Sequence, residues 1–359
     1  MLEMINQVEP NISKDDIQYV TDYMSSGSWI TENKITKKLE ENIAKYVNRK
    51  YSVAVPNGTI ALYLALVASG IKEGHRVAVP NITMIATINA IIWAGAKPII
   101  IDIDNSLCMS EESLKQATDI DAVIYVPLNG RTGSGTAIQD YCKKNKILLI
   151  EDSAHALGSS YSDQKCGSLG NISIFSFTPH KIITMGQGGM VLLDDESIYQ
   201  NLIDLKTFNR EKDKSDVHKG FGLNFKITDL QASLGLSQFN KLEEFINLKK
   251  NIFQEYSKYI DRKHLKHFED FETPWFIDFY CESEKQREEL SHYLSSKNIE
   301  TRYSYPSLSS QSYLQDIKKT MLSKSEEISD KILWLPSSTN LSSEEIKYVS
   351  SEVNNFFNE

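Results

Sequence analysis

Short apolar runs alternate with amphipathic runs along the first half of the chain. The apolar runs have the length of strands and lie at residues 52–55, 76–79, 98–101, 122–126, 147–150, 172–177 and 190–193. Helical spacing of apolar residues predicts helices over 59–69, 85–93 and 136–144, and Gly70 and Gly95 follow the first two. This alternation predicts an α/β fold with a mostly parallel, seven-stranded sheet flanked by helices.

The second half of the chain has a different pattern. Apolar spacing over 228–259 predicts one long helix or two abutting helices that connect two domains. A strand over 275–280, a charged helix over 283–296 and a capped final helix over 342–357 predict a smaller α+β unit. We expect a large domain at residues 1–240 and a small domain at 241–359, with residues 1–30 a candidate to pack on the small domain. The charged segment 206–219 lacks periodicity and predicts a mobile, solvated loop.

Composition limits the classes of partner and compartment. The 359 residues are 41% hydrophobic and 24% charged, as in ordinary globular proteins, and their net charge is -9. That charge disfavours nucleic acid and anionic membranes as partners, so any phosphate must be held locally. The chain lacks a basic leader and any apolar span of about 18 residues, which predicts a soluble, cytoplasmic protein. Neither a disulfide framework nor a zinc site is indicated by the four widely spaced cysteines, Cys108, Cys142, Cys166 and Cys281.

Lys181 is the first candidate for covalent chemistry. It lies between an apolar strand and the glycine-rich stretch 186–189. A lysine that is desolvated there can lose its proton and attack a carbonyl as a Schiff-base lysine, which a solvated lysine with a pKa of about 10.4 does rarely. The alternative is an idle lysine whose ammonium group reaches solvent from a loop.

Three further groups at strand ends point to one cofactor site. Gly58 and Thr59 follow a strand and open a helix, which suits a phosphate, although a capped turn is the alternative. Asp152 follows the strand 147–150, where it could meet a ring nitrogen, cap a helix or bind a metal. Ser176 could bind the same phosphate or be a half-buried strand serine. Together they predict a cofactor that has a phosphate, a ring nitrogen and an aldehyde.

Six motifs resemble one family over nearly the whole chain. The chain resembles the DegT/DnrJ/EryC1/StrS family of pyridoxal-phosphate sugar aminotransferases, which have fold type I. The motifs are Val55-Pro-Asn-Gly-Thr-Ile-Ala-Leu62, Pro80-Asn-Ile-Thr-Met-Ile-Ala-Thr87, Glu151-Asp-Ser-Ala-His155, Phe175-Ser-Phe-Thr-Pro-His-Lys181, Gly186-Gln-Gly-Gly189 and Leu223-Asn-Phe-Lys-Ile-Thr-Asp229.

The resemblance implies a role for each site residue. Lys181 would be the catalytic residue, which bonds to pyridoxal 5'-phosphate and moves the proton. The remaining cofactor contacts would be Asp152 at the ring nitrogen, Ala154 beneath the ring, His155 at the phenolic oxygen, Gly58, Thr59 and Ser176 at the phosphate, Met84 where the family usually has an aromatic residue, and Asn224 from the second subunit of a homodimer with shared active sites.

The resemblance also implies a reaction. An amino group would pass from L-glutamate, through pyridoxamine 5'-phosphate, to a nucleotide-linked keto sugar such as a 4-keto-6-deoxy hexose, for surface polysaccharide or O-antigen synthesis. Positive charge for the nucleotide diphosphate would come from Arg131, Lys226, Arg302 or the segment 206–219. One alternative is a sugar 3-dehydratase, in which histidine replaces the lysine. Here the lysine, Lys181, is present, although His180 stands beside it, and the presence of the lysine favours transamination. The other alternative is a non-catalytic sensor or scaffold.

Overall fold

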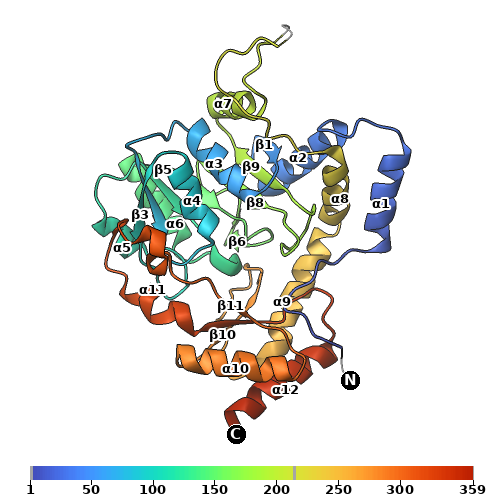
Figure 1. Ribbon diagram of the computed structural model, residues 1–359, viewed down its shortest axis with the longest axis vertical. Coiled ribbons are helices and arrows are strands. Elements are labelled where there is room, and N and C mark those ends of the chain that lie inside the picture. Colours follow the sequence, from blue (N-terminus) through green and yellow to red (C-terminus); the bar gives the residue numbers. More distant parts are fainter. Residues whose placement is uncertain (1–2, 213–215, 359) are drawn as a thin grey trace.

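The computed structural model describes residues 3–212 and 216–358 and shows a large upper lobe and a smaller lower lobe (Figure 1). Across these described parts, every helix is too short or too polar to span a bilayer. The helices are α1 (Lys14–Ser25), α2 (Lys34–Val47), α3 (Gly58–Ala68), α4 (Ile85–Trp93), α5 (Glu111–Gln116), α6 (Gly135–Asn145), α7 (Glu196–Lys206), α8 (Asp229–Phe239), α9 (Leu242–Tyr259), α10 (Glu284–Ser296), α11 (Ser323–Ile328) and α12 (Ser343–Asn358).

An eight-stranded sheet forms the centre of the large lobe, in the order β1-β9-β8-β5-β4-β2-β3-β12. Its strands are β1 (Tyr51–Val55), β2 (Arg76–Pro80), β3 (Lys97–Ile101), β4 (Ala122–Tyr125), β5 (Leu148–Asp152), β8 (Ile172–Ser176), β9 (Gly189–Leu193) and β12 (Lys318–Lys319). Only β9 runs antiparallel to its neighbours β1 and β8 among these strands. The parallel strands therefore end at one common edge, where β5 and β8 present Asp152 and Ser176.

Helices cover both faces of this sheet. The apolar faces of α3, α4 and α7 pack on side chains such as Val79, Ile124 and Val191. The helices α2, α6 and α8 cover the other face, where alternate residues such as Tyr125 and Met190 point. Because both faces are buried, the strands contain nearly continuous apolar residues, and this is why their sequence runs were recognisable.

The small lobe has its own core around a three-stranded antiparallel sheet. That sheet contains β10 (Ile277–Tyr280), β13 (Ile332–Leu335) and β11 (Arg302–Tyr303), and α9, α10 and α12 pack against it. The N-terminal segment also belongs to this core, because Ile5 is buried there and forms a parallel bridge with Ile299. A short hairpin, β6 (Ser160–Tyr161) and β7 (Gln164–Lys165), completes the strands.

The predicted elements are present with three refinements. All seven predicted strands lie in the large sheet, which has a further two-residue edge strand, β12. The segment 228–259 forms two helices, which separate at Asn240 and Lys241. The expectation of a solvated loop from residue 206 was wrong at its start: Lys206 ends α7, is 1% exposed and pairs with Glu32 at 2.6 Å. Residues 213–215 of that segment lie outside the described residues.

Candidate functional site

A cavity of about 440 Å³ lies at the carboxyl edge of the large sheet. Its walls come from the turn after β1, the start of α4, the ends of β5 and β8, the β8–β9 connection, and the small lobe. Eight of the nine predicted cofactor residues line it: Gly58, Thr59, Met84, Asp152, Ala154, His155, Ser176 and Lys181. The structure therefore brings together groups that the chain spreads over more than one hundred positions.

Lys181 occupies the connection between β8 and β9. Its backbone N–H donates to the carbonyl of Thr178 at 3.0 Å, which closes a tight turn. Burial lowers the pKa of the Lys181 amine from 10.5 to about 7, while the carboxylate of Asp152 acts to raise it and Arg302 to lower it. An amine with such a pKa is substantially neutral at physiological pH, as a nucleophile requires.

Asp152 is the last residue of β5 and is 4% exposed. Its Oδ2 accepts a hydrogen bond from the Thr87 hydroxyl at 2.8 Å, and its Oδ1 accepts one from the backbone N–H of Ala154 at 3.3 Å. Burial raises the pKa of this carboxyl, and the Thr87 hydrogen bond is the largest opposing effect. The carboxylate is therefore held in one orientation at the cavity wall.

The turn after β1 and the end of β8 form a compact anion cradle. Asn57 caps α3 by accepting the N–H of Ile60 at 3.0 Å, and α3 starts with Gly58 and Thr59. The first N–H groups of a helix lack intrahelical acceptors, so this end of α3 attracts an anion. A Cβ added at Gly58 would lie 3.0 Å from the Cβ of Ser176. The start of α3 and the end of β8 can therefore approach this closely only because residue 58 is glycine.

His155 and Trp275 form another part of the cavity wall. Their rings stack with centroids 4.0 Å apart, and the Lys181 Nζ lies 3.9 Å from the centroid of the Trp275 ring. The Trp275 Nε1 donates to the carbonyl of His180 at 2.7 Å, which fixes the indole. Burial keeps the pKa of His155 well below 6.5, with Lys181 and then Arg302 acting in the same direction.

Asn224 is the predicted contact that does not line this cavity. It is exposed, and it pairs through a backbone bridge with Thr207 at the base of the arm that connects α7 to α8. In Figure 1 this arm projects above the large lobe near α7. Within its own chain Asn224 is therefore not among the residues that surround Lys181.

The cationic residues that could bind a diphosphate differ in whether they reach the cavity. Arg131 was a wrong candidate, because it is 2% exposed and forms an ion pair with the buried carboxylate of Asp278 while its guanidinium stacks on Phe268 at 3.8 Å. Lys226 is exposed outside the cavity, whereas Arg302 lines it. The segment Pro127-Leu-Asn-Gly-Arg131 thus joins the two lobes, because Asn129 also donates to the carboxylate of Asp278, at 2.7 Å.

Sequence reasoning assigned no role to several cavity residues, among them Thr87, Trp275 and Tyr305. Thr87 lay inside a quoted motif, and its position one helical turn after Thr83 was a signal that could have suggested a shared polar contact. Trp275 and Tyr305 belong to the small lobe, and only the tertiary fold brings them to the edge of the large sheet. The Tyr305 hydroxyl lies 3.4 Å from the His155 Nε2.

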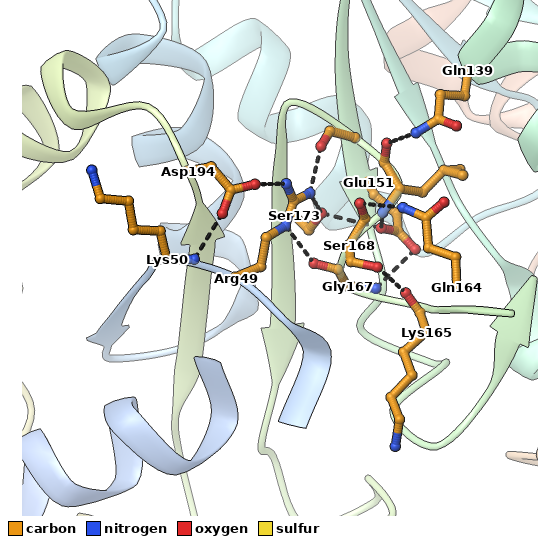
Figure 2. Close-up of polar contacts among 12 residues, drawn as sticks. Arg49, Lys50, Gln139, Glu151, Gln164, Lys165, Gly167, Ser168, Ser173 and Asp194 are labelled. Atoms are coloured by element: carbon orange, nitrogen blue, oxygen red, sulfur yellow. Dashed lines mark hydrogen bonds and ion pairs between the residues drawn. The ribbon is translucent and has the colours of Figure 1, made fainter. Parts of the chain in front are cut away.

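Glu151, adjacent to Asp152, has a different environment on the other face of the sheet, as strand alternation requires. Figure 2 shows its carboxylate among groups of the segment 161–173. It accepts hydrogen bonds from the Tyr161 hydroxyl at 3.1 Å, the backbone N–H groups of Gly167 at 3.0 Å and Leu169 at 2.9 Å, and the Ser173 hydroxyl at 3.1 Å. Glu151 therefore anchors the β5–β8 connection, and Asp152 alone of this pair faces the cavity.

Comparisons with known proteins find relatives that cover nearly the whole chain. The GDP-perosamine synthase of Escherichia coli O157:H7 is 32% identical over 366 residues, with all of both chains covered. Helicobacter pylori PseC, an aminotransferase involved in the biosynthesis of pseudoaminic acid, has a TM-score of 0.93 at 22% identity, covering 99% of this chain and 100% of that one. Spr1654 from Streptococcus pneumoniae, solved in a PLP form, has a TM-score of 0.90 at 25% identity, covering 98% of each chain.

These findings confirm the expected fold class and the expected enzyme class, a transaminase. The family model matches residues 10–354, which include every strand that the structure describes and every predicted site residue. The chain belongs to the DegT/DnrJ/EryC1/StrS aminotransferase family.

Proposed function

We propose that this aminotransferase uses pyridoxal 5'-phosphate to transfer an amino group from L-glutamate to a nucleotide-linked keto sugar. The observation that carries the proposal is the meeting, in one cavity, of a lysine whose pKa is lowered to about 7, a buried carboxylate and an anion cradle. The PLP form of Spr1654 supports the choice of cofactor.

The residues present fit this cofactor. Gly58, Thr59 and Ser176 would hold its phosphate, because they combine a helix N-terminus with two hydroxyl groups. Asp152 would pair with its ring nitrogen, and Ala154 and Met84 supply apolar surface for the ring. When bound, the cofactor supplies an aldehyde for covalent attachment and an electron sink for the reacting carbon.

The chain itself supplies proton transfer and exclusion of water. The Lys181 amine, with a pKa of about 7, can accept a proton and return it within the same cavity. Trp275 covers this amine and is 5% exposed, so the small lobe shields it from bulk water. Arg302 adds a positive charge to the lining, which suits the carboxylate of an amino donor or the diphosphate of a nucleotide.

The names of the relatives support a choice of acceptor class. The name GDP-perosamine synthase specifies a GDP-linked amino sugar for the E. coli protein, so we propose a GDP-linked keto sugar, of the 4-keto-6-deoxy class, as the first acceptor to test. The product would enter surface polysaccharide synthesis such as that of O-antigen. We place the reaction in the cytoplasm, where nucleotide sugars are made.

A homodimer with shared sites would complete the cavity. Asn224 is exposed, and Phe225 beside it lies 6.4 Å, centroid to centroid, from Trp93, which is 50% exposed. Phe221 in the same arm is 69% exposed. Exposed aromatic groups around Asn224 favour a second copy of the chain as the occupant of this surface, with Asn224 reaching the partner's cofactor.

Product analysis tests the reaction. The purified chain is incubated with pyridoxal 5'-phosphate, L-glutamate and GDP-, UDP- and dTDP-linked keto sugars, and products are identified by mass spectrometry and NMR. We expect an amino sugar from wild type and from Lys72→Ala, which changes an exposed lysine, and none from Lys181→Ala. A ring-deoxygenated product would instead indicate the dehydratase, and full activity of Lys181→Ala would exclude the proposed role of this amine.

Subunit complementation tests the shared site. Lys181→Ala and Asn224→Leu are purified separately and then mixed under conditions that exchange subunits. If Asn224 acts on the partner's cavity, one site of the mixed dimer has both residues intact and activity reappears. Persistent inactivity of a mixture that demonstrably contains mixed dimers would contradict the shared site.

A further inference from the structure

Two buried threonines connect α4 to the carboxylate of Asp152. The Thr87 hydroxyl donates to the Asp152 Oδ2 at 2.8 Å, and the Thr83 Oγ1 lies 3.0 Å from the Thr87 Oγ1. Thr87 is 0% exposed, Thr83 is 2% exposed and Asp152 is 4% exposed. All three groups are thus removed from bulk water, and hydrogen bonds are stronger in such low-dielectric surroundings than in water.

The direction of the hydrogen bonds follows from proton counting. A threonine hydroxyl has one proton to donate. Because Thr87 gives its proton to Asp152, the contact between the two hydroxyls requires Thr83 as the donor and Thr87 as the acceptor. The result is a chain of two hydroxyl groups polarised toward the carboxylate, in which the first bond strengthens the second.

Local sequence explains why α4 can do this. Thr83 lies just before α4 and Thr87 lies in its first turn, four positions later, so both side chains project from one side of the helix end. Met84, three positions before Thr87, lines the same cavity. The start of α4 therefore presents an apolar surface and a hydroxyl donor to one site.

We propose that Thr87, supported by Thr83, is a positioning residue for Asp152 that fixes the orientation of the carboxylate and favours its ionised form. This inference rests on the proposed function, in which the ionised Asp152 pairs with a protonated ring nitrogen. Oδ2 is held by Thr87 and Oδ1 by the N–H of Ala154, so the plane of the carboxylate is set before a ligand binds.

The electrostatic surroundings show why such a donor is needed. Burial is the largest effect on Asp152 and raises the pKa of its carboxyl. The bonds from Thr87 and Ala154 and the charge of Lys181 lower that pKa, and Glu151 raises it. Tyr305 also faces Asp152, and burial raises the pKa of its phenol. Removing the Thr87 hydroxyl would leave the effect of burial less opposed.

Infrared difference spectroscopy of the full chain without added cofactor provides a direct test. The protonated carboxyl band of Asp152 is identified by its loss in Asp152→Asn and is titrated against pH. We expect Thr87→Val to raise the pKa of Asp152 by about one unit, a tenfold change in proton affinity, and Thr83→Val to raise it less. Thr87→Ser keeps the hydroxyl and should hold the wild-type value.

Thr36→Val is the matched control, because Thr36 is equally buried but donates its hydroxyl to Asp229 at 2.6 Å. It should leave the Asp152 titration unchanged. An unchanged pKa in Thr87→Val, or equal shifts in Thr87→Val and Thr87→Ser, would overturn the proposal.

Equilibrium binding of pyridoxal 5'-phosphate separates this proposal from the proposed function. We expect Thr87→Val to bind the cofactor about tenfold more weakly than Thr87→Ser, because a bond to a charged group is lost. A wild-type chain that binds no cofactor would overturn the proposed function, while the cofactor-free titration would still decide the role of Thr87.

Discussion

Two charges of opposite sign act on the Lys181 amine, so removing each charge should move its pKa in opposite directions. Burial is the largest effect and lowers this pKa from 10.5 to about 7. The carboxylate of Asp152 raises it, and Arg302 lowers it. We therefore expect Asp152→Asn to lower the pKa of Lys181 below that of wild type and Arg302→Gln to raise it.

The pKa shift caused by burial determines how much more reactive Lys181 should be than an ordinary lysine. At pH 7 an amine with a pKa of about 7 is about half neutral, whereas a lysine with an ordinary pKa is neutral in only about 0.03% of molecules. The neutral fraction, and with it the nucleophilic reactivity at equal access, differs by about a thousandfold. Because Arg302 is an exposed residue, the shift in Arg302→Gln should shrink at high salt.

Competitive labelling measures this pKa without cofactor. The full chain is treated briefly with trace acetic anhydride across pH 5–11, and mass spectrometry follows the peptide that contains Lys181, with peptides of exposed lysines as the internal reference. A Lys181 midpoint near 10, or shifts of the same sign in Asp152→Asn and Arg302→Gln, would refute this account of the cavity.

Three other substitutions have defined outcomes. Asp278→Asn leaves the buried guanidinium of Arg131 without its counter-charge and should lower the free energy of unfolding by about 3–5 kcal/mol in urea titrations; a loss near zero would contradict the buried pair. Gly58→Ala places a Cβ 3.0 Å from that of Ser176, an overpacking of about 1–3 kcal/mol that should weaken cofactor binding about tenfold or more, and unchanged affinity would argue against the cradle. Glu151→Gln turns an amide donor toward groups that are themselves donors and should remove about 2 kcal/mol of stability; an unaltered melting temperature would contradict this.

Most of the large sheet could be predicted because its strands are buried on both faces. The strand β12 could not, since Lys318 and Lys319 are exposed, polar and joined to β3 only by backbone pairing. Such a strand has no hydrophobic pattern, and its partner lies far away in sequence. The break between α8 and α9 was left open for a related reason, because apolar spacing continues across Asn240 and Lys241.

The residues of the candidate site likewise divide into those that the sequence could predict and those that it could not. Gly58, Asp152 and Ser176 could be proposed because each lies at the end of an apolar strand, and parallel strands end at one edge. The error at Arg131 arose because its partner, Asp278, belongs to the other lobe. A positive charge in the sequence does not indicate whether it is already neutralised inside the fold. Whether Asn224 serves a partner's site likewise depends on a second chain.

The two ends of the chain meet in the small lobe, where Ile5 packs in the same core as Val353 of α12. The ribosome delivers Ile5 before the large sheet and Val353 after it, so these two residues can meet only when the chain between them has been made. Strands β1 to β9 of the large sheet can form on the nascent chain, but the small lobe must wait until α12 has been made, and Trp275 and Arg302 belong to this lobe. Lys181 should therefore acquire its lowered pKa only after the small lobe has formed, so that a partly made chain has the anion cradle without a fully shielded amine.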